Sequence, residues 1–139
     1  MLYQAAHYML VASAKAVESC HRITPDAQIG CMIAGGSFYP YSCNPEDVWQ
    51  SMIDERTNTF FVDVQAKGEY PYYMESLFKS KGIQIDISDH DKEVLKQTVD
   101  FVAFSYYASR TSIADITRIE KNEGNVIVSA KNPYLKMSD

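Results

Sequence analysis

Several features that identify common protein classes are scarce or missing in this sequence. The 139 residues include three cysteines, Cys20, Cys31 and Cys43, without Cys-x-x-Cys spacing. Buried reduced thiols are the expected interpretation, with a disulfide or a metal site as the alternative. No apolar run approaches the roughly 20 residues that cross a bilayer. Lysine and arginine form no cluster and the net charge is −5, so we expect neither a membrane nor a nucleic-acid partner.

Signals for targeting and for catalysis are missing as well. Polar residues, among them His7, Lys15 and Glu18, interrupt the first apolar stretch too early for a signal peptide, which predicts a cytoplasmic location. The glycines do not match a phosphate-binding loop, and neither a metal-ligand cluster nor a Ser-His-Asp order is present. We therefore expect no nucleotide, metal or other cofactor. Because none of these catalytic motifs is present, they do not indicate an activity.

Two continuous apolar runs predict buried strands. They cover residues 29–34 and 99–107, and the second ends abruptly in hydroxyl side chains. Runs with little alternation are typical of parallel strands that are covered on both faces. Ligand sites in parallel α/β proteins lie at the C-terminal ends of the strands. Ser105, Tyr106 and Tyr107 are therefore candidates for substrate contact.

Helical patterns precede and separate the two runs. Apolar periodicity predicts a first helix over residues 4–23. A second helix is predicted to begin at Pro45 and to include residues 57–64. A third covers 72–81 with Gly82 as its C-terminal cap, and a fourth follows a capping box at Ser88 and includes 92–97. The apolar face of the first helix is expected to carry Met9, Ala12, Ala16, Cys20 and Ile23. The buried face of the second is expected to carry Val48, Trp49, Met52 and Ile53. No hairpin signal lies between the strands, so a parallel pair joined by a helical crossover follows. The pattern predicts an α/β slice of a doubly wound sheet or of a (β/α)8 barrel.

Three further positions invite a functional interpretation. His7 has no adjacent serine, cysteine or carboxylate, so we expect a structural hydrogen-bonding residue. Glu69 lies in a Gly-Glu-Tyr-Pro stretch that predicts a turn between helices, which favours a structural role. Gly35 and Gly36 either make a turn or allow a close backbone approach that a ligand could use, and both interpretations stay open.

Longer motifs along nearly the whole chain resemble those of a known family. They are Gln4-Ala5-Ala6-His7, Ile29-Gly30-Cys31-Met32, Tyr39-Pro40-Tyr41, Asn44-Pro45-Glu46-Asp47-Val48, Gly68-Glu69-Tyr70-Pro71, Phe104-Ser105-Tyr106-Tyr107 and Lys131-Asn132-Pro133-Tyr134-Leu135-Lys136. Together they resemble glycoside hydrolase family 1, and in particular its bacterial 6-phospho-β-glucosidase branch.

The resemblance implies both a fold and a reaction. The fold is part of a (β/α)8 barrel, roughly helix 4 to strand 6 and the following loop, so that residues 1–139 form a single incomplete segment. The reaction is the retaining hydrolysis of 6-phospho-β-D-glucosides by two carboxylates about 5 Å apart. The resemblance also implies that both glutamates lie outside the chain, one in an Asn-Glu motif upstream of Met1 and one in a Glu-Asn-Gly motif downstream of Asp139. The isolated chain is then expected to be inactive.

The resemblance assigns a supporting role to Tyr107. This residue matches the second tyrosine of the family's Asn-Tyr-Tyr motif, which hydrogen-bonds the nucleophile. A phenol donor beside a carboxylate favours its ionised form. Ser105 stands where the wider family has asparagine, as in the phospho-specific branch, and is a substrate-contact candidate together with Tyr106. Phe38 and Tyr39 are candidates for the aglycone side.

Two interpretations of function remain open at this point. The chain is either a central segment of a 6-phospho-β-glucosidase or a stand-alone α/β half-barrel that binds a ligand or a partner without catalysis. Reading the open reading frame on both sides separates them. In either case the strands are apolar on both faces, which predicts self-association of the isolated chain.

Overall fold

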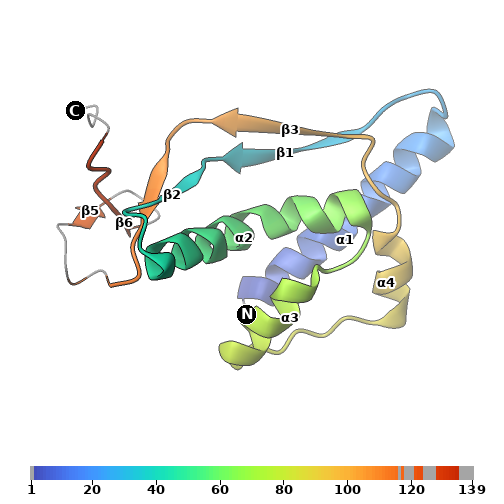
Figure 1. Ribbon diagram of the computed structural model, residues 1–139. Coiled ribbons are helices and arrows are strands. Elements are labelled where there is room, and N and C mark those ends of the chain that lie inside the picture. The colour runs from blue at the N-terminus through green and yellow to red at the C-terminus, as the bar shows by residue number, and fades with distance from the viewer. Residues whose placement is uncertain (1, 116, 118–120, 124–127, 135–139) are drawn as a thin grey trace. The chain divides into compact units, whose positions relative to one another are not determined.

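The computed structural model describes residues 2–115, 117, 121–123 and 128–134. The elements in chain order are α1 (Leu2–Ile23), β1 (Gly30–Gly35), β2 (Phe38–Pro40), α2 (Pro45–Lys67), α3 (Tyr72–Ser80), α4 (Asp89–Leu95), β3 (Phe101–Tyr106), β4 (Arg110–Ser112), β5 (Lys121–Glu123) and β6 (Val128–Ala130) (Figure 1). The chain divides into two compact units. The helical unit contains Met1–Ile33 and Thr59–Phe104, and the strand-tip unit contains Ala34–Asn58 and Ser105–Asp139.

The core of the helical unit lies between α1, the second half of α2, α3 and α4. Its buried side chains come from all four helices, and they are Leu10, Val11, Ala14, Phe60, Val64, Met74 and Leu95. The members from α1 follow the three- and four-residue spacing that places side chains on one helix face. Met74 and Val64 have no exposed surface. The predicted helix over 4–23 is therefore confirmed, but its predicted buried face is wrong, because Met9 and Ile23 are 72% and 74% exposed and Leu10, Val11 and Ala14 pack on the core instead.

Local signals define the helix ends of this unit. The Ser88 hydroxyl accepts the backbone N–H of Asp91, and the Asp91 side chain accepts the backbone N–H of Ser88, so the predicted capping box is confirmed. Gly82 has a φ of +61°, the left-handed conformation that glycine adopts without a Cβ clash. The stretch 57–64 lies within α2, so its helical prediction is confirmed against its strand propensity.

β1 and β3 pair with each other, and their arrows point the same way in Figure 1. Just before the two strands, Asp100 fixes their starts relative to each other. Its backbone N–H donates to the Ile29 carbonyl at 2.9 Å, and its carboxylate accepts the Ile29 N–H at 2.8 Å. The predicted parallel pair with a helical crossover is thereby confirmed.

The prediction that the second strand is buried on both faces is wrong within this chain. Phe101, Val102 and Phe104 are 51%, 43% and 68% exposed. Each of the two strands has one hydrogen-bonded strand neighbour in the part of the chain that the structure describes. An apolar run indicates that a strand is suited to a buried position. Helices or strands must still pack against both of its faces to bury it.

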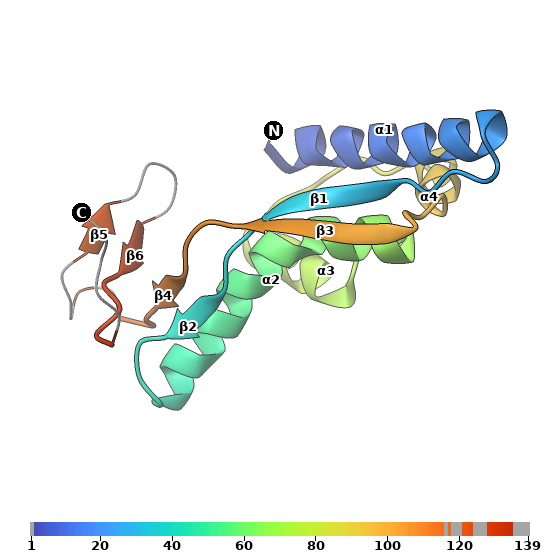
Figure 2. The ribbon, with the colours of Figure 1, turned by 90° about the horizontal axis from the view of Figure 1, so that it is seen from above.

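The strand-tip unit contains two small strand pairs and the first half of α2. β2 pairs in parallel with β4, with Phe38 opposite Arg110 and Pro40 opposite Ser112. Figure 2 shows these two strands side by side. β5 and β6 form an antiparallel pair. The helix begins as predicted after Asn44, whose side-chain oxygen accepts the Glu46 N–H at 3.1 Å.

Two predictions about burial are corrected in this unit. Val48 and Trp49 are 46% and 58% exposed, whereas Asp47 and Ser51 on the same helix are 2% and 7% exposed. The buried face of this half of α2 is polar because hydrogen-bond donors from outside the helix reach it. Cys43 is free and exposed, so the prediction of a buried thiol is wrong there.

Among the described helices, none is long and apolar enough to cross a membrane.

Candidate functional site

All five predicted site residues lie in the strand-tip unit. Ser105 and Tyr106 end β3, and Tyr107 follows directly. Phe38 and Tyr39 belong to β2, which begins shortly after β1 ends. The segments after the two strands come into direct contact because β2 pairs with β4. The structure therefore brings the predicted residues to one region of the chain.

Gly36 lies where the two segments approach each other most closely. A Cβ at this position would lie 2.6 Å from the backbone oxygen of Ala108, the residue after Tyr107. The neighbouring backbone hydrogen bond runs from the Arg110 N–H to the Ser37 carbonyl at 2.9 Å. The group that approaches Gly36 this closely is the protein's own backbone rather than a ligand. No side chain fits at position 36 without displacing the chain next to Tyr107.

Tyr107 presents its phenol to solvent. The residue is 84% exposed, and its side chain makes no hydrogen bond with the described residues. Tyr106 is 50% exposed, and its hydroxyl lies 2.6 Å from the Ser109 hydroxyl, so the turn after β3 is closed by a side-chain hydrogen bond. Ser105 is half-buried. Of the three predicted strand-end residues, Tyr107 therefore has the phenol most available to another group.

Phe38 and Tyr39 differ in what surrounds them. The Arg110 guanidinium carbon lies 5.3 Å from the centre of the Phe38 ring, within the range of a cation–π contact. The Phe38 N–H donates to the Glu55 carboxylate at 2.9 Å. Tyr39 is 46% exposed. Phe38 is thus fixed by contacts to both its ring and its backbone, whereas the ring of Tyr39 is accessible to solvent.

A row of carboxylates on α2 holds the segments that follow the strands, and the sequence-based reasoning missed it. Asp47 accepts the Ser42 hydroxyl at 2.6 Å and the Ala114 N–H at 2.9 Å. Asp54 accepts the Ser112 hydroxyl at 2.6 Å. With Glu55, these acids recur at seven- and eight-residue steps, which places them on one helix face. This spacing of acidic residues in the sequence is the signal that indicates such a polar face.

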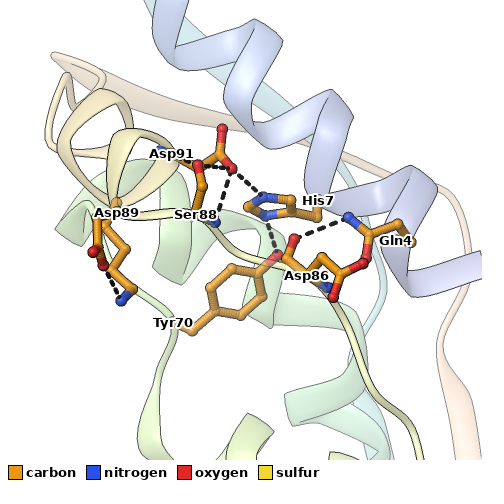
Figure 3. A network of polar contacts seen from close by, with 8 residues as sticks. Gln4, His7, Tyr70, Asp86, Ser88, Asp89 and Asp91 are labelled. Carbon is orange, nitrogen blue, oxygen red and sulfur yellow. Dashed lines mark hydrogen bonds and ion pairs between the residues drawn. The ribbon is translucent and has the colours of Figure 1, made fainter.

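His7 belongs to the helical unit, where its side chain lies among polar residues (Figure 3). Its side chain is fully buried, with Nδ1 3.2 Å from the Tyr70 hydroxyl and Nε2 3.6 Å from an Asp91 carboxylate oxygen. Burial raises the pKa of Tyr70 to about 12, so its hydroxyl keeps its proton. Hydrogen bonds, first from the Ser88 hydroxyl, lower the pKa of the Asp91 carboxyl. The predicted structural hydrogen-bonding role of His7 is confirmed.

Glu69 and the acidic side chains of α2 have different surroundings. Glu69 is exposed in the bend between α2 and α3, so its predicted place in a turn between helices is confirmed. In the residues that the structure describes, no group of three or more histidine, cysteine, aspartate or glutamate side chains is placed to hold a metal ion. The acids of α2 are engaged with donors of their own chain instead.

Comparison with known sequences identifies relatives along the entire chain. A family model described as glycosyl hydrolase family 1 matches residues 1–139. The 6-phospho-beta-glucosidase AscB of Escherichia coli (strain K12) is 53% identical over 137 residues, which cover 99% of this chain and 29% of that protein. The aryl-phospho-beta-D-glucosidase BglH of Bacillus subtilis (strain 168) is 48% identical over 139 residues, with 99% and 30% covered. The chain therefore spans about 30% of the length of these curated relatives.

Comparison with solved structures identifies the same architecture. The GH1 beta-glucosidase from Exiguobacterium antarcticum B7 superposes with a TM-score of 0.68 at 22% sequence identity. The match covers 94% of this chain and 29% of that chain. At this level of identity the likeness concerns the fold. The predicted α/β class, with parallel strands joined by helices as part of a (β/α)8 barrel, is confirmed.

Proposed function

Because the chain belongs to glycosyl hydrolase family 1, we propose that it is the central segment of a longer retaining 6-phospho-β-glucosidase, called the parent enzyme below. One observation carries the proposal. Two relatives whose names specify phospho-β-glucosidase activity are 53% and 48% identical to almost the whole chain. The substrate class is then a 6-phospho-β-D-glucoside. A cytoplasmic location belongs to the same proposal, as does the assignment of residues 1–139 to one incomplete barrel segment.

The chemistry of the parent enzyme requires two carboxylates. In retaining hydrolysis one carboxylate attacks the anomeric carbon while a carboxylic acid protonates the departing oxygen, and water then cleaves the glycosyl-enzyme bond. We assign both groups to parts of the parent enzyme outside these 139 residues. The exposure of the Tyr107 phenol supports a role as hydrogen-bond donor to the nucleophile. Such a donor stabilises the ionised carboxylate and keeps it ready to attack.

The remaining predicted residues would contact the substrate. Ser105 and Tyr106 would lie near the sugar because they end β3. Phe38 and Tyr39 would line the aglycone side, where an aromatic ring offers an apolar surface to an aryl or sugar leaving group. The exposed ring of Tyr39 and the Arg110-stacked ring of Phe38 support this division.

The experiment begins with the open reading frame on both sides of the chain. We expect an Asn-Glu motif upstream and a Glu-Asn-Gly motif downstream. The parent enzyme should cleave an aryl 6-phospho-β-glucoside faster than the unphosphorylated aryl β-glucoside. Tyr107→Phe should lower kcat more than it raises KM, since one such hydrogen bond contributes about 1–3 kcal/mol. Equal rates on both substrates would refute the substrate class, and an unchanged kcat would refute the role of Tyr107.

The isolated chain should behave differently from the parent enzyme. We propose that it is catalytically silent and self-associates through the sheet formed by β1 and β3. The exposure of Phe101 and Phe104 supports this. Covering about 800 Å² of apolar surface is worth on the order of 20 kcal/mol at about 25 cal/mol per Å², before the entropy of association is subtracted.

Light scattering coupled to size exclusion tests self-association, and a chromogenic 6-phospho-glucoside tests silence. A monodisperse monomer would contradict the first expectation. Turnover above the buffer rate would contradict the second. If the flanking sequence lacks both motifs and the chain binds a ligand without cleaving it, the stand-alone half-barrel becomes the better interpretation.

A further inference from the structure

The position of Tyr107 depends on the backbone that carries it. Its side chain is 84% exposed and has no hydrogen-bond partner within the described residues. A phenol that must meet a carboxylate at hydrogen-bond distance has to be held within a few tenths of an ångström of the productive position. Within the described part of this chain, packing of the ring does not provide that restraint. The restraint that this chain supplies comes from the residues on either side of Tyr107.

The residues after Tyr107 are fixed at several successive points. The Tyr106 and Ser109 hydroxyls are 2.6 Å apart, which closes the turn that contains Tyr107. The Arg110 N–H then donates to the Ser37 carbonyl at 2.9 Å. Two residues later the Ser112 hydroxyl donates to Asp54 at 2.6 Å. The two backbone segments also touch directly, because the space beside Gly36 is filled by the Ala108 carbonyl.

The contact between Ser112 and Asp54 differs from the others in two ways. It joins residues 58 positions apart, so it ties the Tyr107 segment to a long helix rather than to another loop. It is also partly shielded from water, because Ser112 is 5% exposed and Asp54 is half-buried. A short hydrogen bond from a hydroxyl to a carboxylate in such surroundings is among the stronger side-chain contacts.

We propose that Ser112 and Asp54 are positioning residues for Tyr107. Their hydrogen bond holds the phenol where the nucleophile of the parent enzyme can accept a hydrogen bond from it. The inference rests on the proposed function, since it concerns the reaction in which Tyr107 takes part. Neither residue touches the substrate. Removing the Ser112 hydroxyl leaves the carboxylate without that donor and releases the segment that carries Tyr107.

The test uses the parent enzyme with Ser112→Ala and with Ser112→Thr, which keeps a hydroxyl. Ser13→Ala is the matched control, because the Ser13 hydroxyl donates at 2.7 Å to Gln65 in the other unit. We expect Ser112→Ala to lower kcat about tenfold, with KM changed less than about twofold, as for loss of a contact made in the transition state. Ser112→Thr should restore most of kcat, and Ser13→Ala should leave it near the wild-type value.

A double-mutant cycle separates positioning from general stability. In a Tyr107→Phe background, Ser112→Ala should lower kcat by less than about twofold, because no hydroxyl remains to be positioned. A merely structural role would lower kcat by the same factor in both backgrounds, and that result would overturn the inference. Amide hydrogen exchange gives a second readout without substrate. Residues 105–112 should exchange faster in Ser112→Ala and at the wild-type rate in Ser13→Ala.

Unchanged exchange in Ser112→Ala would also overturn the inference. The proposed function fails separately, and visibly, in the wild-type parent enzyme. If that enzyme cleaves the unphosphorylated glucoside better, the substrate class is wrong, and the cycle is carried out with that substrate. If it cleaves neither compound, both the proposed function and the positioning role are refuted.

Discussion

Tyr70→Phe should destabilise the chain although it removes a single oxygen atom. That oxygen lies 3.2 Å from Nδ1 of the fully buried His7. With the imidazole proton on Nε2, which faces Asp91 at 3.6 Å, Nδ1 is the acceptor of the Tyr70 hydroxyl. Phenylalanine keeps the ring and its packing, so little cavity forms. The variant therefore isolates the loss of one partner from a buried nitrogen.

The magnitude follows from the burial of His7. A buried polar atom that loses its partner costs about 1–3 kcal/mol. His7 Nε2 already lacks a hydrogen bond with the described residues, so the ring cannot compensate through its second nitrogen. We expect the free energy of unfolding to fall by about 2 kcal/mol. With a urea slope of about 1–3 kcal/mol per molar, the midpoint falls by about 1 M.

The assay is urea unfolding followed by circular dichroism at one fixed protein concentration. Tyr8→Phe is the matched control, because Tyr8 is 61% exposed and its ring centre lies 5.9 Å from that of His7. Its stability should stay within about 0.5 kcal/mol of the wild type. Combining Tyr70→Phe with His7→Leu removes both polar partners and should cost less than the sum of the single changes. Equal midpoints for Tyr70→Phe and wild type would refute this account of His7.

Two further predictions concern titratable groups. The pKa of Asp100 is lowered, first by the Ile29 N–H and then by His21, so its contribution to stability is present above about pH 4 and is lost as the pH falls through the lowered value. Asp100→Asn should flatten the acid limb of an unfolding-midpoint profile, and an unchanged limb would refute this. Cys43 is exposed, whereas burial raises the pKa of Cys31, so a disulfide reagent at pH 8 should modify Cys43 first. Peptide mapping by mass spectrometry after partial modification checks the order.

The parts of the fold that could be predicted are those determined by neighbouring residues. The capping box of Ser88 and Asp91 and the cap glycine Gly82 depend on residues within one helical turn. The stretch 57–64 was harder, because its side chains favour strands while the surrounding pattern favours a helix. In the structure this stretch continues the helix that begins at Pro45, despite the strand propensity of its side chains.

The parts that could not be predicted depend on partners far along the chain. Nothing near Asp54 indicates that its acceptor oxygen meets a hydroxyl 58 residues later. The apolar character of Val48 and Trp49 predicts that they are buried, because apolar residues usually lie in the interior. Donors from other segments instead hydrogen-bond to the polar face of the helix, and that face is the buried one. The sequence predicts which residues lie at the candidate site. It does not predict which groups hydrogen-bond to the segments that carry them.

Two of the contacts to α2 use main-chain groups, and this has a consequence for how the region can change. The Phe38 and Ala114 amides donate to Glu55 and Asp47, so the contacts persist whatever side chain stands at position 38 or 114, with proline as the exception. Position 38 lies on the side that we assign to the leaving group. If Phe38 contacts the leaving group as we propose, single substitutions at this position can change leaving-group preference while both backbone contacts to α2 stay in place.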